Sequence, residues 1–407
     1  MNRLKEDLIE AGKFGREPQR RVERYAELDP EKGVTRPEGT PANRQIRDFA
    51  VQRMKAAGLS VKIDKFGNIF GRIPGMLADC GSVMCGSHLD SVLNGGQFDG
   101  ALGVFAAIEA VRRMQEDGFQ NERAVEVVAF TGEEGSAFGQ GLLGSSALCG
   151  KLGQSEALSV INAENKSLAE ILKQTGYNGD FERKLNNVDY FVEMHIEQGP
   201  VLNNAQIPLG IVENITGVAW ITATIKGMEN HAGTTPMNMR QDALVAAAEV
   251  VSFVRRRANA IAARYGSPTV GTVGRLEVSP NGINVIPGKV RLGIDIRDVR
   301  HKIMQHLMDD TVEMLKGLEP THGVAVQVQI PPVHDPVPLA TELVQTIEAA
   351  AQKTGIRYLK MNSGAGHDAQ IMAGRVKAGM IFVPSKNGVS HSPLEWTDWE
   401  DIEKGVS

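Results

Sequence analysis

Cysteine is scarce in this sequence of 407 residues. Only Cys80, Cys85 and Cys149 occur. Their number is odd and no two of them have the C-x-x-C spacing, which excludes a disulfide framework and argues against a thiolate metal site. We therefore expect three reduced, mostly buried thiols.

Long apolar segments and runs of like charge are also missing. The N-terminal segment, MNRLKEDLIEAGKFGREPQRR, lacks the continuous apolar stretch of a signal peptide, and no later segment is apolar for long enough to cross a bilayer. The 44 Lys and Arg residues stand against 49 Asp and Glu residues. Nothing therefore indicates a nucleic acid or a membrane as partner, and the sequence predicts a soluble, cytoplasmic protein that binds a small molecule.

The length favours two domains, and the first part of the chain predicts an α/β sheet. Short apolar runs alternate there with helical patterns, as in a sheet of buried strands joined by helices. The expected helices cover 41–58 and 101–117, and the expected strands cover 60–64, 68–73, 81–87, 124–130, 190–196 and, far downstream, 379–383. Residues 151–189 are interpreted as a helical insertion.

The middle of the chain predicts a different architecture. Its expected elements run in the order β-α-β-β-α-β, which is that of a ferredoxin-like α+β domain. They are a strand at 218–226, a helix at 241–264, strands at 269–277 and 289–297, a helix at 301–318 and a strand at 324–330. We therefore expect a catalytic domain of residues 1–213 plus 331–407, interrupted by an inserted domain of residues 214–330.

Imidazoles and carboxylates follow the ends of four expected strands. His88 and Asp90 follow one strand, Glu133 and Glu134 another, and histidines follow the remaining two. Taken singly, each has an ordinary structural explanation; Thr131 to Glu134, for example, fits a helix capping box. Taken together, they would be costly to desolvate at one edge of a sheet unless a cation lay between them. Nitrogen and oxygen donors suit zinc, manganese, cobalt or nickel.

Five longer motifs carry a family resemblance. They are EMHIEQGP at 193–200, GINVIPG at 282–288, DIRDV at 295–299, SGAGHDA at 363–369 and FVPSKNGVSHSP at 382–393. With the residues at the strand ends, these motifs resemble the hydantoinase/carbamoylase branch of the family of amidohydrolases and peptidases with two metal ions. That branch includes N-carbamoyl-L-amino-acid hydrolases, allantoate amidohydrolases and β-ureidopropionases. The resemblance extends from about residue 33 nearly to the C-terminus.

The resemblance implies two divalent metal ions in each subunit. It makes Asp99 the carboxylate that bridges both ions, His88 and His391 ligands of opposite ions, and Glu134 and His195 the remaining ligands. Peptidase and aminoacylase relatives usually have an acidic residue where His195 stands, so this histidine favours cleavage of ureido groups. Asp90, two residues after His88 on the same strand face, is expected to orient the imidazole of His88.

The resemblance also implies catalytic and substrate-binding roles. Glu133 is expected to act as general base and then as general acid on a water activated by the metal ions. His231 is expected at the start of the main helix of the inserted domain, where it would stabilise the oxyanion in the neighbouring subunit of a homodimer. The expected substrate-binding residues are Gln198, Asn284, Arg297, Gly364, Ala365 and Gly366, with Arg297 and Asn284 on the substrate's carboxylate.

The expected reaction is hydrolysis of the ureido C–N bond of N-carbamoyl-L-amino acids, which releases the amino acid, ammonia and carbon dioxide. Allantoate hydrolysis is a close alternative, and an aminoacylase or dipeptidase activity is a more distant one. The inserted domain would serve as a lid and as the dimerisation domain. The roles of His367 and Asp368 stay open, whereas His301, His306, His322 and His334 are interpreted as structural or solvated.

Overall fold

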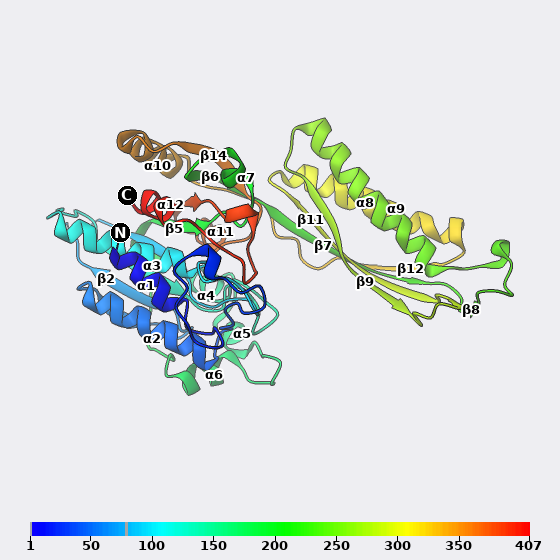
Figure 1. Ribbon diagram of the computed structural model, residues 1–407, viewed down its shortest axis with the longest axis horizontal. Helices are drawn as coiled ribbons and strands as arrows, with labels where there is room; N and C mark the ends of the chain where they lie inside the picture. The colour runs from blue at the N-terminus through cyan, green and yellow to red at the C-terminus, as the bar shows by residue number, and fades with distance from the viewer. Residues whose placement is uncertain (1, 78–79) are drawn as a thin grey trace. The chain divides into compact units, whose positions relative to one another are not determined.

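The computed structural model describes residues 2–77 and 80–407, and they form two compact units (Figure 1). Unit 1 comprises the residues up to Glu213 together with Leu339–Ser407, and unit 2 comprises Asn214–Pro338. The second division lies after Pro338 and not after residue 330 as expected. The physical reason is local pairing, because Val218 and His334 exchange two backbone hydrogen bonds that hold the later segment to unit 2.

Unit 1 contains a mixed sheet of nine strands among the described residues, in the order β1-β2-β4-β3-β5-β15-β6-β13, with β14 paired to β6. The strands are β1 (Ser60–Ile63), β2 (Ile69–Ile73), β3 (Ser82–His88), β4 (Val125–Phe130), β5 (Val188–Ile196), β6 (Leu209–Ile215), β13 (Val337–Pro338), β14 (Tyr358–Ser363) and β15 (Lys377–Val383). The expected α/β sheet is confirmed.

The four central strands of this sheet, β4, β3, β5 and β15, are parallel neighbours. Their residues are largely buried, as expected of strands that are covered on both faces. Since parallel strands end at one edge of a sheet, the residues that follow these four strands meet there.

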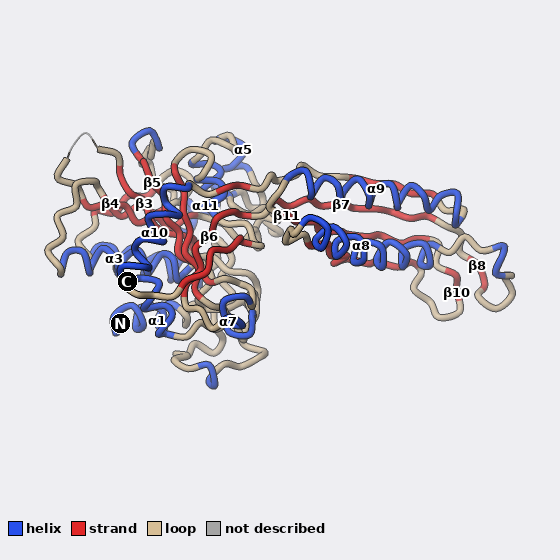
Figure 2. The backbone as a smooth tube through the Cα atoms, turned by 90° about the horizontal axis from the view of Figure 1, so that it is seen from above, coloured by secondary structure: helices blue, strands red, loops and turns tan. Residues whose placement is uncertain are grey.

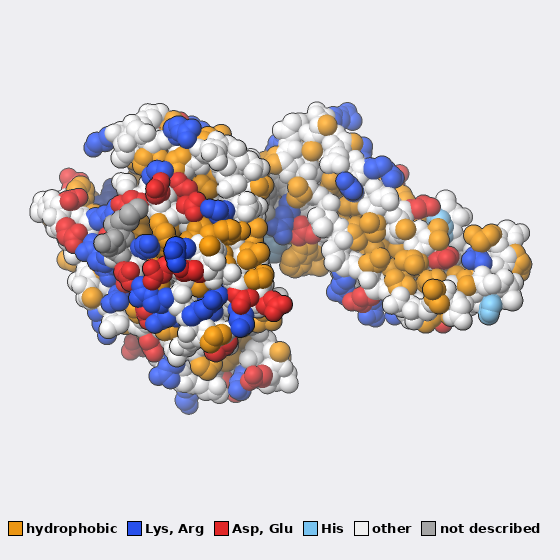
Figure 3. Space-filling view, in the orientation of Figure 1, with side chains coloured by type: hydrophobic (Ala, Val, Ile, Leu, Met, Phe, Trp, Pro, Cys, Tyr) orange, Lys and Arg blue, Asp and Glu red, His pale blue; other side chains and the backbone are white. Residues whose placement is uncertain are grey.

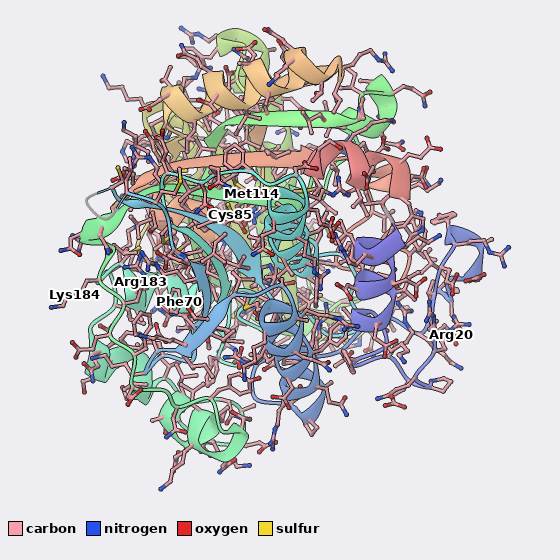
Figure 4. All side chains as sticks on the ribbon, turned by 90° about the vertical axis from the view of Figure 1, so that its left-hand side faces the viewer. Arg20, Phe70, Cys85, Met114, Arg183 and Lys184 are labelled. Carbon is pink, nitrogen blue, oxygen red and sulfur yellow. The ribbon has the colours of Figure 1, made fainter. Side chains whose placement is uncertain are left out.

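Helices cover the sheet of unit 1. They are α1 (Asn2–Ala11), α2 (Pro41–Ala56), α3 (Ala101–Glu116), α4 (Leu143–Leu148), α5 (Gln154–Ser159), α6 (Leu168–Thr175), α7 (Val201–Ala205), α10 (Thr341–Thr354), α11 (Asp368–Met372) and α12 (Trp399–Val406). The main apolar cluster lies between α1, α2, α3 and the sheet, and Cys85 of β3 and Met114 of α3 pack against it (Figure 4). The three cysteines are free thiols, and Cys149 is buried.

Local sequence explains where the helices of unit 1 begin and end. Pro41 occupies the first turn of α2, where no backbone donor is needed, and the hydroxyl of Thr40 accepts the N–H of Asn43. Within the expected insertion at 151–189, α6 begins with a capping box of Ser167 and Glu170 and ends at Gly176 in the left-handed conformation. The sequence did not predict helices α1, α4, α7, α10, α11 and α12 or strands β6, β13 and β14.

Unit 2 has the expected β-α-β-β-α-β order. Its strands β7 (Gly217–Lys226), β9 (Val270–Ser279), β11 (Lys289–Asp298) and β12 (Ala325–Gln329) form an antiparallel sheet in the order β12-β7-β11-β9. The helices α8 (Ala243–Tyr265) and α9 (His301–His322) run along this sheet (Figure 2). Alternate residues of β7 and β11 face the helices and form a second apolar core.

Two short strands of unit 2 differ from expectation. His231 does not open the main helix, because it lies in β8 (Asn230–His231), which pairs with β10 (Val285–Ile286). The helix α8 begins only at Ala243, after Asp242 has capped its first turn.

The exposed faces carry charges of both signs. Over α1 and α2 of unit 1, Lys and Arg alternate with Asp and Glu (Figure 3). Several of these charges form ion pairs, such as Arg21 with Glu6. Among the described residues, no helix has the length and apolar character that a bilayer span requires.

Candidate metal centre

The carboxyl edge of the four parallel strands brings the expected metal ligands together within unit 1. His88 is the last residue of β3, His195 lies one residue before the end of β5, and Glu134 follows β4. Asp99 lies just before α3, and His391 lies in the loop after β15. The sequence therefore predicted this cluster correctly from strand ends.

Asp99 lies at the centre of the cluster, and its two oxygens face different histidines. Its Oδ1 lies 3.4 Å from Nε2 of His88 and 3.2 Å from Nε2 of His195. Its Oδ2 lies 3.4 Å from Nε2 of His391, which in turn lies 3.3 Å from Oε2 of Glu134. The residues thus form two groups of three that share one carboxylate.

These separations fit divalent cations. Donor atoms about 2.0 to 2.1 Å from a tetrahedral cation are about 3.3 to 3.4 Å apart, which matches the spacing around Asp99. The second oxygen of Glu134, Oε1, is buried and has no hydrogen-bond partner. A buried carboxylate oxygen without a partner is costly unless a cation satisfies it. The residues present therefore suit two cations with Asp99 as the shared ligand.

The two buried imidazoles are oriented to present Nε2 to Asp99. Nδ1 of His88 lies 3.2 Å from the carbonyl of Asp90, and Nδ1 of His195 lies 2.9 Å from the carbonyl of Ile196. A carbonyl can only accept, so each Nδ1 donates and each Nε2 of the neutral ring keeps its lone pair. The backbone N–H of Gly100 points at Nε2 of His195 from 3.2 Å, in agreement with this tautomer.

Gly100 is required at this point of the chain. Its φ angle is +63°, and a Cβ there would lie 2.3 Å from the ring of His88. The close approach lets α3 begin beside both imidazoles.

Asp90 shapes the turn that carries the two glutamates. Its carboxylate accepts the backbone N–H groups of Glu133 and Glu134, each at 3.1 Å, and its Oδ1 lies 3.5 Å from Nδ1 of His88. The interpretation of residues 131–134 as a helix capping box is wrong, because no helix begins there and α4 starts only at Leu143. At the start of a helix the backbone N–H groups of Glu133 and Glu134 would lack partners within the helix. Here the carboxylate of Asp90 accepts both of them.

Glu133 lies beside the cluster and not within either ligand group. Its Oε2 is 3.6 Å from Nε2 of His88. Burial, together with the charges of Glu134 and Asp368, raises the pKa of Glu133 well above its usual value, although His88 opposes this shift. The side chain can therefore hold a proton near neutral pH.

The carboxylates and imidazoles of the cluster share protons in the absence of a cation. The hydrogen bond to Asp99 and the charge of Glu134 raise the pKa of His391 to about 9, although burial opposes them. Burial and the charge of Asp99 raise the pKa of Glu134 to about 8. Both pKa values are raised because negative charge gathers in this site, and a divalent cation would neutralise part of that charge.

Two residues of the site adopt the left-handed backbone conformation without being glycine. They are Gln198, with φ of +58°, and His391, with φ of +53°. Such conformations persist where the surroundings enforce them, and they concentrate at functional sites. Here they turn Nε2 of Gln198 to within 2.8 Å of Oδ2 of Asp99 and 3.3 Å of Nε2 of His391.

Several neighbours of the ligands were left open or missed from sequence. The ring of the buried His367 lies 4.6 Å from that of His195, and its Nε2 lies 2.9 Å from the hydroxyl of Ser363. The expected substrate-binding residues at 364–366 form the loop between Ser363 and His367. Glu395, which is buried beside Asp99, had been missed. The only local indication that Glu395 is buried is that it stands between two large apolar residues, Leu394 and Trp396.

The remaining expected residues lie in unit 2. His231 and Asn284 are neighbours, because the N–H of Ala232 donates to the carbonyl of Asn284 at 3.0 Å beside the β8–β10 pair. Arg297 lies near the other end of β11. Residues 289 and 297 of that strand are about 26 Å apart at 3.3 Å per residue. Within one chain, Arg297 and Asn284 therefore do not meet.

Comparison with known proteins supports an enzyme of this kind. Residues 84–407 match the family described as peptidase family M20/M25/M40. An N-carbamoyl-L-amino acid amidohydrolase of Geobacillus stearothermophilus is 40% identical, over 99% of this chain and 95% of that protein. An allantoate amidohydrolase of Escherichia coli is 35% identical, over 93% of this chain and 92% of that protein.

A solved structure agrees with these sequence matches. An amidase of the hydantoinase/carbamoylase family from Burkholderia multivorans superimposes with a TM-score of 0.91 at 34% identity, covering 100% of this chain and 95% of that one. The chain therefore belongs to the M20 family of metal-dependent hydrolases, in its hydantoinase/carbamoylase branch.

Proposed function

We propose that the protein hydrolyses the ureido C–N bond of N-carbamoyl-L-amino acids, with release of the amino acid, ammonia and carbon dioxide. The observation that carries this proposal is the pair of three-residue groups that share Asp99, with Glu133 beside them. The extent of the match to relatives named N-carbamoyl-L-amino acid amidohydrolase supports the choice of substrate.

Two divalent cations would occupy the centre. His88 and His195 would hold one and Glu134 and His391 the other, with Asp99 shared between them. When bound, the cations supply a lowered pKa for water and polarisation of the substrate's carbonyl. A ureido carbonyl needs such help, because two nitrogen atoms donate electron density to it. Zinc, manganese, cobalt and nickel all suit this donor set.

Glu133 is proposed as the proton carrier. The N–H of its own residue is fixed by Asp90, so the carboxylate is held next to the ligand His88. In its ionised form it takes a proton from the attacking water, and in its protonated form it gives this proton to the departing nitrogen. A raised pKa suits both halves of this task at neutral pH.

His231 is proposed as a donor to the oxyanion. Its Nδ1 accepts the backbone N–H groups of Gly233 at 3.0 Å and Thr234 at 3.1 Å. Because Nδ1 accepts, the neutral ring carries its proton on Nε2 and can donate it outward. The side chain is exposed, which leaves it accessible to another molecule. This arrangement supports a role in the active site of a neighbouring subunit, and hence a homodimer.

Arg297 is proposed to bind the substrate's carboxylate. Asp295 accepts from Nε of Arg297 at 2.9 Å and from Nη2 at 3.1 Å, and it also accepts from Nε1 of Trp220 at 2.8 Å. These contacts orient a guanidinium whose fork suits a carboxylate. Since the length of β11 separates Arg297 from Asn284, a carboxylate that contacts both must lie between two chains.

The other substrate contacts remain proposals from the family resemblance. Gln198 is proposed to contact the ureido group, and its Oε1 is buried without a hydrogen-bond partner. Gly364, Ala365 and Gly366 are proposed to bring backbone close to the substrate. A side chain at Gly364 would have no atom within 4 Å, which is consistent with open space beside this loop.

Allantoate is the second candidate substrate, because allantoate amidohydrolases of two bacteria also match most of the chain at 35% identity. Both substrates offer a ureido group and a carboxylate, so the proposed centre serves either.

The test measures ammonia release from N-carbamoyl-L-amino acids, N-carbamoyl-β-alanine and allantoate, with chelator-treated protein refilled separately with manganese, zinc and cobalt. We expect metal-dependent release from N-carbamoyl-L-amino acids, and a loss of at least about 100-fold in Glu133→Gln, since general acid–base catalysis contributes about 10² to 10⁴. Faster turnover of allantoate would select the second candidate. Turnover of dipeptides or N-acyl amino acids without ammonia release from any ureido substrate would refute both.

A further inference from the structure

Glu395 is a fully buried carboxylate between the two loops that carry Asp99 and His391. Its Oε1 accepts the backbone N–H groups of Phe98 at 3.0 Å and Asp99 at 3.1 Å. Its Oε2 accepts the hydroxyl of Ser390 at 2.9 Å. The two backbone N–H groups can only donate, and the hydroxyl of Ser390 donates to the ionised carboxylate, so ionised Glu395 acts purely as an acceptor.

The hydroxyl of Ser390 links Glu395 to the shared carboxylate. It lies 3.2 Å from Oδ2 of Asp99, the oxygen that faces His391. A hydroxyl has one proton and can donate it to only one of the two carboxylates at a time. If the proton goes to Glu395, it does not compete with a cation for Oδ2 of Asp99, which also lies 2.8 Å from Nε2 of Gln198.

The loop before Asp99 is fitted closely around Glu395. A Cβ at Gly96 would lie 2.0 Å from Cδ of Glu395, a separation that real atoms do not reach. Glycine at this position therefore makes room for the carboxylate. The contacts join segments 296 residues apart in sequence, so only the folded chain creates them.

We propose that Glu395 is a positioning residue of the metal centre, which holds the backbone of Asp99 and the proton of Ser390 so that Oδ2 of Asp99 can bind the cation on the Glu134–His391 side. This inference rests on the proposed two-cation centre. It assigns to Glu395 an effect on one of the two cation sites, whereas a residue needed only for folding would affect both or neither.

The substitution Glu395→Gln tests the need for a pure acceptor. An amide keeps one acceptor oxygen but replaces the other with a donor. If the oxygen still receives the two backbone N–H groups, the hydroxyl of Ser390 faces an N–H₂ group and must turn its proton to Asp99. That proton would then compete with the cation on the Glu134–His391 side.

The experiment adds Co²⁺ to metal-free protein and follows visible absorption and calorimetry. In the wild type we expect two cations per chain. In Glu395→Gln we expect one site to keep its affinity and the other to weaken by about 10- to 100-fold, the range found when residues that orient metal ligands are changed. The absorption of the weakened site should change as well.

Asp298→Asn is the matched control. Asp298 of unit 2 is also fully buried, and it accepts two hydroxyls, of Ser267 and Thr269, and one backbone N–H, of Arg300. We expect Asp298→Asn to lower thermal stability while both Co²⁺ affinities stay unchanged.

Gly96→Ala provides a second route, because it displaces the Glu395 carboxylate without removing any polar group. It should weaken the same site, and it serves as the test if Glu395→Gln does not fold. Wild-type affinities and spectra in the folded variants would overturn this inference alone. A wild type that binds fewer than two cations would overturn the two-cation centre and this inference with it.

Discussion

At the scale of single residues, the site consists of buried carboxylates whose negative charge must be balanced by positive charge. The carboxylates of Asp99, Glu134 and Glu133 are buried together beside the imidazoles of His88, His195 and His391. Protons partly balance this charge in the free protein. A divalent cation would displace them, so its binding is coupled to pH.

The pH dependence of metal binding follows from His391. Its pKa is raised to about 9, mainly by the hydrogen bond to Asp99, so the ring is protonated at neutral pH in the free protein. A cation that binds Nε2 must displace this proton. We expect the affinity of the cation site on the Glu134–His391 side to rise by at least about tenfold per pH unit between about pH 6.5 and 8, because Glu134 also carries a proton there, and to level off above about pH 9.

Calorimetry in two buffers of different ionisation enthalpy measures the protons released. The control is His301→Gln, because His301 of unit 2 also contacts a carboxylate, that of Asp335, at 2.6 Å. This variant should release the same number of protons as the wild type. Cation affinity that does not vary with pH in this range would contradict the prediction.

At the scale of elements, α3 is held against the strands that carry the ligands. A Cβ at Gly103 would lie 2.5 Å from the carbonyl oxygen of Met194 and 2.7 Å from Cβ of Ser87. These two residues directly precede His195 and His88. The absence of a side chain at Gly103 therefore lets helix and strands approach closely beside His195 and His88.

Two glycines inside helices allow a matched test of this packing. Alanine should favour the helix by about 1 kcal/mol at either position. At Gly317 of α9 a Cβ would meet no atom within 4 Å, so Gly317→Ala should stabilise the protein. Gly103→Ala should instead destabilise it by about 1 to 3 kcal/mol, the usual cost of overpacking. Denaturant unfolding measures both, and equal stabilisation would refute the packing argument.

Strand β11 allows a second prediction at this scale. Asp295 and Arg297 lie on one face of the strand, and Asp295 holds two nitrogens of the guanidinium. In Asp295→Ala the guanidinium loses this orientation, so we expect KM for carboxylate substrates to rise about tenfold, or about 1.4 kcal/mol, with little change in kcat.

The control for Asp295 lies in the same sheet. Glu277 of β9 pairs with Arg275 at 3.0 Å on the exposed surface, and Glu277→Gln should leave KM unchanged. A fall in kcat at constant KM in Asp295→Ala would place Asp295 outside carboxylate binding.

At the scale of the whole molecule, we propose that the reaction uses residues of two chains. His231 and Asn284 lie together beside β8 and β10, whereas Arg297 lies the length of β11 away. One chain cannot bring all three to the same substrate carboxylate and oxyanion. A symmetric dimer would supply two such composite sites.

Complementation between two inactive variants tests this arrangement. His231→Ala lacks the oxyanion donor but keeps Glu133, whereas Glu133→Gln lacks the base but keeps His231. In a mixed dimer one of the two sites has both residues. We expect random mixing of equal amounts to restore about a quarter of wild-type activity. No recovery after verified subunit exchange would show that His231 acts within its own chain or not at all.

The sequence alone determined the α/β sheet, the ferredoxin-like order of unit 2 and the side chains that gather at the proposed metal centre. Each depends on a local pattern, since polar residues after buried strands must gather where parallel strands end. His88, Glu134 and His195 were found for this reason. Asp99 and His391 lie in loops that follow two of these strands, and the family resemblance then implied the role of each residue as a ligand.

Only the tertiary structure decided the relations between distant segments. Local patterns misplaced His231 at a helix start, gave the second boundary of unit 2 as residue 330, and did not indicate that β11 separates Arg297 from Asn284. Glu395 was missed because its partners, Phe98 and Asp99, lie almost 300 residues away in the chain. Hydrogen bonds of this kind exist only once the strands have paired, so no periodicity in the sequence records them.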